Sequence, residues 1–142
     1  MPNNSPNQSG SIIFWKDDSD HEAMNLPDEG SGESARKTFD ADFNKIEMSD
    51  IPSATTITIQ RRISDNRLAS YIKLLTMHSP TSLDRTEYEY LLNTYKPGDF
   101  VSSALGIKML EKRDYTSVKS PGLNADYPLD CSVKLSGSPP SP

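Results

Sequence analysis

The sequence predicts an α+β fold that is mostly helical, and two observations lead to this prediction. Between Ile51 and Val118, apolar residues recur at intervals of three and four positions, the period of amphipathic helices. A short stretch of alternating apolar and polar residues precedes them, as expected of a strand. We therefore expect a small three-helix core with one or two short strands, flanked by a disordered N-terminal arm and a C-terminal tail.

Charge and composition divide the chain into three segments. Residues 1–50 carry eleven Asp or Glu against four Lys or Arg, whereas residues 51–142 carry nine against eleven. We interpret residues 1–50 as an acidic interaction arm without fixed structure, and residues 51–118 as the small folded core. Residues 119–142 are interpreted as a Ser/Pro-rich tail that contains a short strand at 131–135.

The first elements of the predicted core are a strand and a helix. Ile57 and Ile59 alternate with polar, mostly β-branched residues, which predicts one half-buried strand. Ser64 or Asp65 then caps a helix that ends before Pro80. This helix places four apolar residues on one face: Leu68, Tyr71, Ile72 and Leu75.

Two more helices and a second strand complete the prediction. A helix from Thr81 or Ser82 has Tyr88, Leu91, Leu92 and Tyr95 on one face. After a turn at 96–99, a third helix capped by Asp99 carries Val101, Ala104, Leu105 and Met109. Cys131, Val133 and Leu135 alternate in the second strand, which we expect to pair with the strand that contains Ile57 and Ile59.

Composition narrows the classes of function. A net charge of -5 and a pI of about 4.9 argue against a general nucleic-acid binder, because such proteins need a basic face. The single cysteine, Cys131, excludes an intrachain disulfide and a multi-cysteine zinc site. With neither a signal peptide nor a 20-residue apolar run visible, we expect an intracellular protein, cytoplasmic or nucleocytoplasmic.

The sequence offers little support for catalysis or for a cofactor. The two histidines, His21 and His78, lie in different segments, and the acidic residues lack the spacing of a calcium loop. Nucleophile elbows, phosphate-binding loops and dinucleotide-binding fingerprints are absent from the sequence. We therefore predict a non-enzymatic protein without a metal or cofactor.

An apolar island followed by acidic residues is the strongest candidate for partner binding. The island consists of Ile12, Ile13, Phe14 and Trp15, and the acidic flank of Asp17, Asp18 and Asp20. The combination resembles a SUMO-interacting motif, in which an apolar strand adds to a sheet edge, with Trp15 where an aliphatic residue is usual. We predict that it docks onto a protein partner; the alternative is that Trp15 packs back onto the core.

Several serines have the sequence context of phosphorylation sites. Ser19 precedes acidic residues, Ser120 and Ser138 precede proline, and Ser64 follows two arginines. Phosphate on Ser64 would favour a helix N-terminus, but we favour the interpretation that Ser64 is simply a helix cap. The sequence therefore predicts an accessible, regulated chain.

Two alternatives to protein docking remain open at this point. One is a small self-associating structural or accessory protein. The chain resembles viral matrix-like proteins in organisation only, through its short length and its combination of folded and disordered segments. The other is an RNA contact through a local basic patch of Arg61, Arg62 and Arg67 near tyrosines. The leading hypothesis is a regulatory or interaction protein whose N-terminal segment captures a protein partner.

Overall fold

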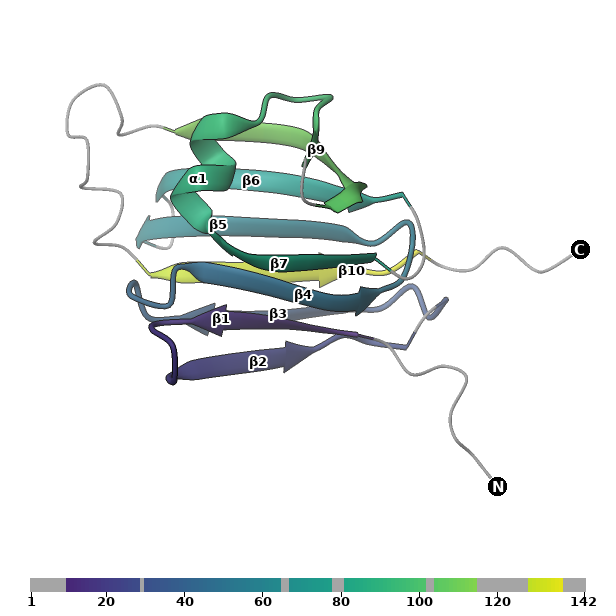
Figure 1. The fold of residues 1–142 in the computed structure, drawn as a ribbon, viewed down its shortest axis with the longest axis horizontal. Helices are drawn as coiled ribbons and strands as arrows, with labels where there is room; N and C mark the ends of the chain where they lie inside the picture. Colours follow the sequence, from purple (N-terminus) through teal and green to yellow (C-terminus); the bar gives the residue numbers. More distant parts are fainter. Residues whose placement is uncertain are drawn as a thin grey trace, which may run out of the picture.

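The structure, a computed structural model, consists of two antiparallel β-sheets packed face to face. It describes residues 10–28, 30–64, 67–77, 81–101, 104–114 and 128–136. Figure 1 shows the strands of both sheets lying roughly along one common axis, with β1 and β2 pointing in opposite directions. The described residues also include one short helix. The class of protein that these residues define is an antiparallel β-sandwich.

The smaller sheet contains four strands, in the order β2-β1-β4-β7. The strands are β1 (Ser11–Trp15), β2 (His21–Asn25), β4 (Lys45–Ile51) and β7 (Thr81–Glu87). β1 pairs with β2 on one edge and with β4 on the other, with Phe14 opposite Glu22 and Ile46 respectively. β1 is thus an inner strand of its sheet.

The larger sheet contains six strands, in the order β3-β10-β5-β6-β9-β8. The strands are β3 (Ser34–Phe39), β5 (Thr56–Ser64), β6 (Arg67–Thr76), β8 (Phe100–Val101), β9 (Ala104–Asp114) and β10 (Leu129–Lys134). Every described strand pair in both sheets is antiparallel. The strand β10, near the C-terminus, lies between β3 and β5 and pairs with both. It therefore connects β3, from the first third of the chain, to β5.

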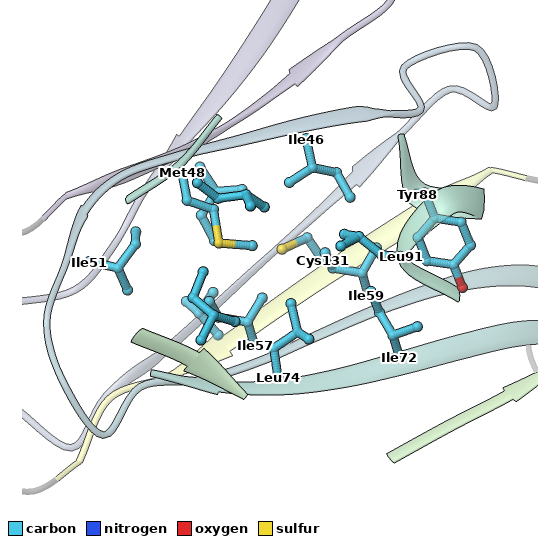
Figure 2. Packing of buried hydrophobic residues seen from close by; sticks show 14 of the residues in the cluster. Ile46, Met48, Ile51, Ile57, Ile59, Ile72, Leu74, Tyr88, Leu91 and Cys131 are labelled. Carbon is cyan, nitrogen blue, oxygen red and sulfur yellow. The ribbon is translucent and has the colours of Figure 1, made fainter. Parts of the chain in front are cut away.

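The hydrophobic core fills the space between the two sheets. Phe14 of β1 stacks on Phe39 of β3, with ring centroids 4.1 Å apart, and so connects one sheet to the other. Figure 2 shows Met48 of β4 opposite Ile57 and Cys131 of the larger sheet. All these side chains are buried, as the alternation of strand residues between two faces requires.

The prediction of a mostly helical core was wrong. Of the described residues, 63% lie in strands and 7% in helix. The first expected helix is the strand β6, in which Ile72 and Leu74 face the core while Tyr71 and Leu75 face outward. The apolar residues that are spaced as on one face of a helix are therefore divided between the two faces of a strand.

The other two expected helices fare differently. The segment of the second helix is divided between β7 and the short helix α1 (Tyr88–Thr94), whose Tyr88, Leu91 and Leu92 are buried against the core. The segment of the third helix forms β8 and β9. Only one helix is thus present among the described residues, and it covers one end of the sandwich.

The pairing predicted between the two strands is confirmed. β5 and β10 are neighbours, with Ile57 opposite Val133 and Ile59 opposite Cys131. All four side chains are buried, so the alternation seen in the sequence reflects one shared core face. β10 starts at Leu129, slightly before the predicted strand.

The prediction that the N-terminal segment is a disordered arm was also wrong for the described residues. Four strands, β1 to β4, lie between residues 11 and 51 and belong to both sheets. The change in charge near Asp50 falls inside β4, whose Ile46, Met48 and Ile51 are buried. Several acidic residues of this segment, Asp17, Asp18, Asp20, Asp40 and Asp42, lie between strands and are exposed, so their charge does not conflict with burial.

Candidate functional site

The predicted docking segment is β1, and its alternation divides the segment between two environments. Ile12 and Phe14 are fully buried in the core, whereas Ile13 and Trp15 are half-buried on the outer face of the smaller sheet. Successive strand residues point to opposite faces, so the four residues cannot form a single anchor. Of the four side chains, only Ile13 and Trp15 reach an outer face of the sheet.

Trp15 is held in place by side chains from three other strands. Its indole Nε1 donates a hydrogen bond of 2.8 Å to Oε1 of Glu47 on β4. The Arg85 guanidinium from β7 lies 3.8 Å from the ring centroid, and the His21 ring from β2 lies 4.3 Å away at 32°. We call Ile13, Trp15, His21, Glu47 and Arg85 the Trp15 platform.

The acidic residues after β1 form a turn beside this platform. The Asp17 carboxylate accepts hydrogen bonds from the backbone N–H groups of Ser19 and Asp20, at 2.9 and 2.8 Å. These bonds favour the ionised form and lower the pKa of Asp17 below its ordinary value. Asp18 pairs with Arg85 at 3.2 Å, so the turn also helps to orient the cation over the indole.

The arrangement differs from the one that the SUMO-interacting resemblance implies. That mode requires an extended segment with a free edge, which adds to the sheet of its partner. Both edges of β1 are already paired, with β2 and with β4. Any recognition by this segment in the folded protein therefore uses its outward side chains and not its backbone.

The four candidate phosphorylation sites lie in different contexts. Ser19 is exposed in the acidic turn, and its hydroxyl donates a 3.1 Å hydrogen bond to Asp17. Ser64 is the last residue of β5 and does not begin a helix; its side chain is not among those described. Ser120 and Ser138 lie outside the described residues.

Arg61, one of the three arginines in the alternative of an RNA contact, is fully buried. Its Nε and Nη2 atoms donate hydrogen bonds of 2.9 and 3.3 Å to the Glu89 carboxylate on α1, and its guanidinium lies 5.4 Å from the Tyr88 ring centroid. A bidentate geometry of this kind compensates a buried guanidinium. Arg61 therefore fastens α1 to β5 and does not face solvent.

Arg62 points the other way, to the outer face of the larger sheet. It forms an ion pair with Asp130, which also pairs with Arg36 at 2.8 Å and accepts a hydrogen bond from Thr38. Asp130 itself is only 2% exposed, whereas the side chains of Arg36 and Arg62 are 51% and 25% exposed, so the carboxylate is covered by its own partners. The side chain of Arg67 is not described, and the three arginines do not form one described patch.

The described residues contain little that suggests a metal centre or a reactive thiol. Nowhere in the described ranges do three or more His, Cys, Asp or Glu residues gather as potential metal ligands. Cys131 is buried, and burial together with the neighbouring Asp130 charge raises its thiol pKa far above the ordinary range. The described part of the chain also has no helix that is long and apolar enough to cross a membrane.

Sequence reasoning missed three members of the Trp15 platform. His21, Glu47 and Arg85 come from β2, β4 and β7, so they meet Trp15 only through the pairing order of the sheet. The alternation of buried Ile46 and Met48 does place Glu47 on an outer face, which is a usable signal. No local pattern in the sequence indicates the strand order that brings Arg85 close.

Comparisons with known proteins identify no relative: no family model, curated protein or solved structure matches the chain.

Proposed function

We propose that this protein is a non-enzymatic protein-binding module that recognises its partner through the Trp15 platform. The observation that carries the proposal is the fixed position of a half-buried tryptophan on an outer sheet face, with contacts to Glu47, Arg85 and His21. Tryptophan and arginine are the residues that most often dominate binding energy at protein interfaces. Their combination here makes a compact anchor.

Preorganisation favours this surface over the docking of a flexible arm. β1 is held on both edges and by two core residues, Ile12 and Phe14, so little conformational entropy remains to be lost on binding. The indole N–H bond to Glu47 fixes the ring orientation. A partner therefore meets a ring that already has its final geometry.

The charges beside the platform indicate the chemistry of the partner. Asp17 and Asp20 are both exposed in the turn that follows β1. A partner segment with an aliphatic or aromatic side chain on Trp15 and basic residues toward the turn would match both features. We accordingly propose a basic, amphipathic protein segment as the ligand class, bound in a reducing intracellular compartment.

The single tryptophan of the chain provides a direct test. Peptides are selected from a random displayed library against the wild-type protein, and binding is then measured by the change in Trp15 fluorescence. We expect selected peptides to be rich in Lys, Arg and large apolar residues. Their affinity for Ile13→Ala should fall about tenfold or more, as expected when a central contact is truncated.

A matched control distinguishes binding at the Trp15 platform from non-specific binding to exposed aromatic residues. Tyr90 on α1 is another exposed aromatic residue, 51% accessible, and it lies on a different element. Tyr90→Ala should leave peptide affinity unchanged. The proposal fails if the selected peptides bind Ile13→Ala and wild type equally, or if they lose affinity for Tyr90→Ala instead.

Self-association is a second candidate function, and one observation favours it. β2 ends the smaller sheet, no described strand pairs with its outer edge, and four of its five side chains are exposed. An exposed strand edge is a template for antiparallel pairing with a second copy. Sedimentation velocity over increasing concentration should then show a dimer that Ala23→Pro weakens; a monomer throughout would reject this candidate.

A further inference from the structure

The outer face of the six-stranded sheet carries a second feature, independent of the Trp15 platform. The register places outward-facing residues of β3, β10, β5, β6, β9 and β8 in cross-strand rows. One row contains Lys134, Thr56, Leu75, Lys108 and Phe100, each opposite the next. The short helix α1 lies on the other side of this sheet, since its Tyr88, Leu91 and Leu92 are buried in the core.

Basic side chains predominate on this face. Its described members include six basic residues, which are Arg36, Arg62, Lys73, Lys108, Arg113 and Lys134, and two acidic residues, Glu111 and Asp130. We call these six residues the basic sheet face. They come from five of the six strands, so the positive charge spreads in two dimensions and not along one line.

The two acidic residues are engaged within the sheet. Asp130 is almost fully buried between Arg36 and Arg62. Glu111 accepts a 3.1 Å hydrogen bond from Tyr71 and lies 4.0 Å from the Lys73 ammonium. The outward-facing side chains of the neighbouring strands β10 and β5 include the hydroxyl groups of Ser132, Thr56 and Thr58.

Exposed apolar side chains adjoin this face at one corner. Phe100 and Met77 are each 43% exposed, and Phe100 lies 6.0 Å from the Lys108 ammonium. The Met77 backbone N–H donates to Gly106 at the start of β9, which places the end of β6 beside that strand. Large apolar residues next to lysines are the combination that inserts into the interface of an anionic bilayer.

We propose that the basic sheet face binds peripherally to membranes that contain anionic lipids, with Phe100 and Met77 entering the headgroup region. A broad two-dimensional distribution of charge matches a planar anionic surface. A single nucleic-acid strand would instead call for a line of cations interleaved with stacking aromatic residues. The exposed side chains of Phe100 and Met77 could also be buried in a bilayer, whereas a phosphate backbone offers no apolar surface to cover them.

The net charge of -5 does not prevent this orientation. Many acidic residues lie in the turns after β1 and β3, including Asp17, Asp18, Asp20, Asp40 and Asp42. Charges separated by more than a Debye length, about 8 Å at physiological salt, are largely screened from one another. The basic sheet face therefore approaches the lipid while acidic turns elsewhere on the molecule stay in solution.

Vesicle sedimentation with the full-length chain tests the proposal. The probes are vesicles of equal parts phosphatidylcholine and phosphatidylserine, compared with vesicles of phosphatidylcholine alone. We expect binding to the anionic vesicles only, weakening steeply as salt is added. The double variant Lys108→Glu with Lys134→Glu should bind about tenfold or more weakly, because both reversals put negative charge on the face.

A matched double variant controls for the total charge. Lys16→Glu with Lys45→Glu makes the same change in net charge, but both lysines lie on the smaller sheet or its turn. This variant should bind anionic vesicles within about twofold of wild type, since its reversals lie away from the face. Phe100→Ser should retain the dependence on phosphatidylserine and bind more weakly, and circular dichroism must show that each variant is folded.

Other outcomes would overturn the proposal. Equal binding to both kinds of vesicle, or equal loss in both double variants, would remove the role of the basic sheet face. The face would be assigned to nucleic acid if anionic vesicles bind neither protein, while a single-stranded RNA oligonucleotide binds wild type but not the double variant Lys108→Glu with Lys134→Glu. Self-association that this double variant abolishes, again without vesicle binding, would assign it to a second copy.

Discussion

The outer faces of the two sheets differ in chemistry although they cover one core. The smaller sheet presents a tryptophan held by Glu47, His21 and Arg85, with acidic residues in the adjoining turn. The larger sheet presents cations and hydroxyl groups, with Phe100 at one corner. A chain with an overall negative charge thus places two different surface chemistries on opposite sides of a sandwich.

The comparison shows that adjacent residues of a strand can lie in different environments, one in the core and the next on an outer face. Phe14 stacks in the core while Trp15 lies on an outer face. Arg61 fastens α1 from inside, while Arg62 pairs with Asp130 on the opposite face of the same strand. Substitutions at adjacent positions should therefore separate stability from binding.

The largest expected effect on stability follows from removing the aromatic contact between Phe14 and Phe39, which joins the two sheets. Phe14→Ala removes a fully buried ring that stacks on Phe39, and should lower the free energy of unfolding by about 3–5 kcal/mol. Urea titration followed by circular dichroism measures this loss. A loss comparable to that of an exposed residue would mean that β1 does not pack in the core.

A comparison of the two adjacent arginines comes next. Arg61→Ala leaves the Glu89 carboxylate without its bidentate partner at one end of the core, and should cost about 3 kcal/mol. Arg62→Ala should cost only about 1 kcal/mol, because Arg36 still pairs with Asp130. Equal losses in thermal or urea unfolding would contradict the assignment of these residues to opposite faces.

Trp15→Ala should have a smaller effect on stability than on binding. It removes one hydrogen bond and one cation–π contact on a half-buried face, together about 1–2 kcal/mol. Peptide binding, measured by calorimetry because this variant lacks the fluorophore, should fall below detection. A collapse of stability as large as that of Phe14→Ala would make Trp15 a packing residue and would refute the Trp15 platform as a docking surface.

The smallest expected effect is the pH response of the acidic turn. The folded pKa of Asp17 lies below its ordinary value of 3.8, so its contribution to stability is present above that value and is lost as pH falls through the folded pKa. NMR should show the Ser19 and Asp20 amide signals shifting in this acid range. Asp17→Asn should remove the shared titration; unchanged signals in wild type would contradict the observed hydrogen bonds.

Some elements were predictable from the sequence because their alternation is local and clear. The pairing of β5 with β10 follows from alternating residues such as Ile57, Ile59, Cys131 and Val133, all of which face one core. The same signal exists in β4, where Ile46 and Met48 alternate, but the acidic composition of residues 1–50 obscured it. Charge on turns and outer faces says little about whether the intervening strands are buried.

Other elements could not be deduced from periodicity. β6 carries apolar residues on both faces, since Ile72 and Leu74 point inward while Tyr71 and Leu75 point outward, and their combined spacing imitates a helix. The Trp15 platform needs the order β2-β1-β4-β7, which depends on contacts between strands far apart in the sequence. Arg61 points into the core because β5 extends to Ser64, so that Arg61 continues the inward alternation of Ile57 and Ile59.

The most direct test of the β-sandwich with an integral β1 is a nuclear Overhauser spectrum of the isotope-labelled full-length chain. It should show backbone cross-peaks between β1 and β4, where Phe14 faces Ile46, and between β5 and β10, where Ile59 faces Cys131. Sequential amide contacts of helical type through residues 68–75, or mobile residues 11–15 with no cross-strand peaks, would contradict the account.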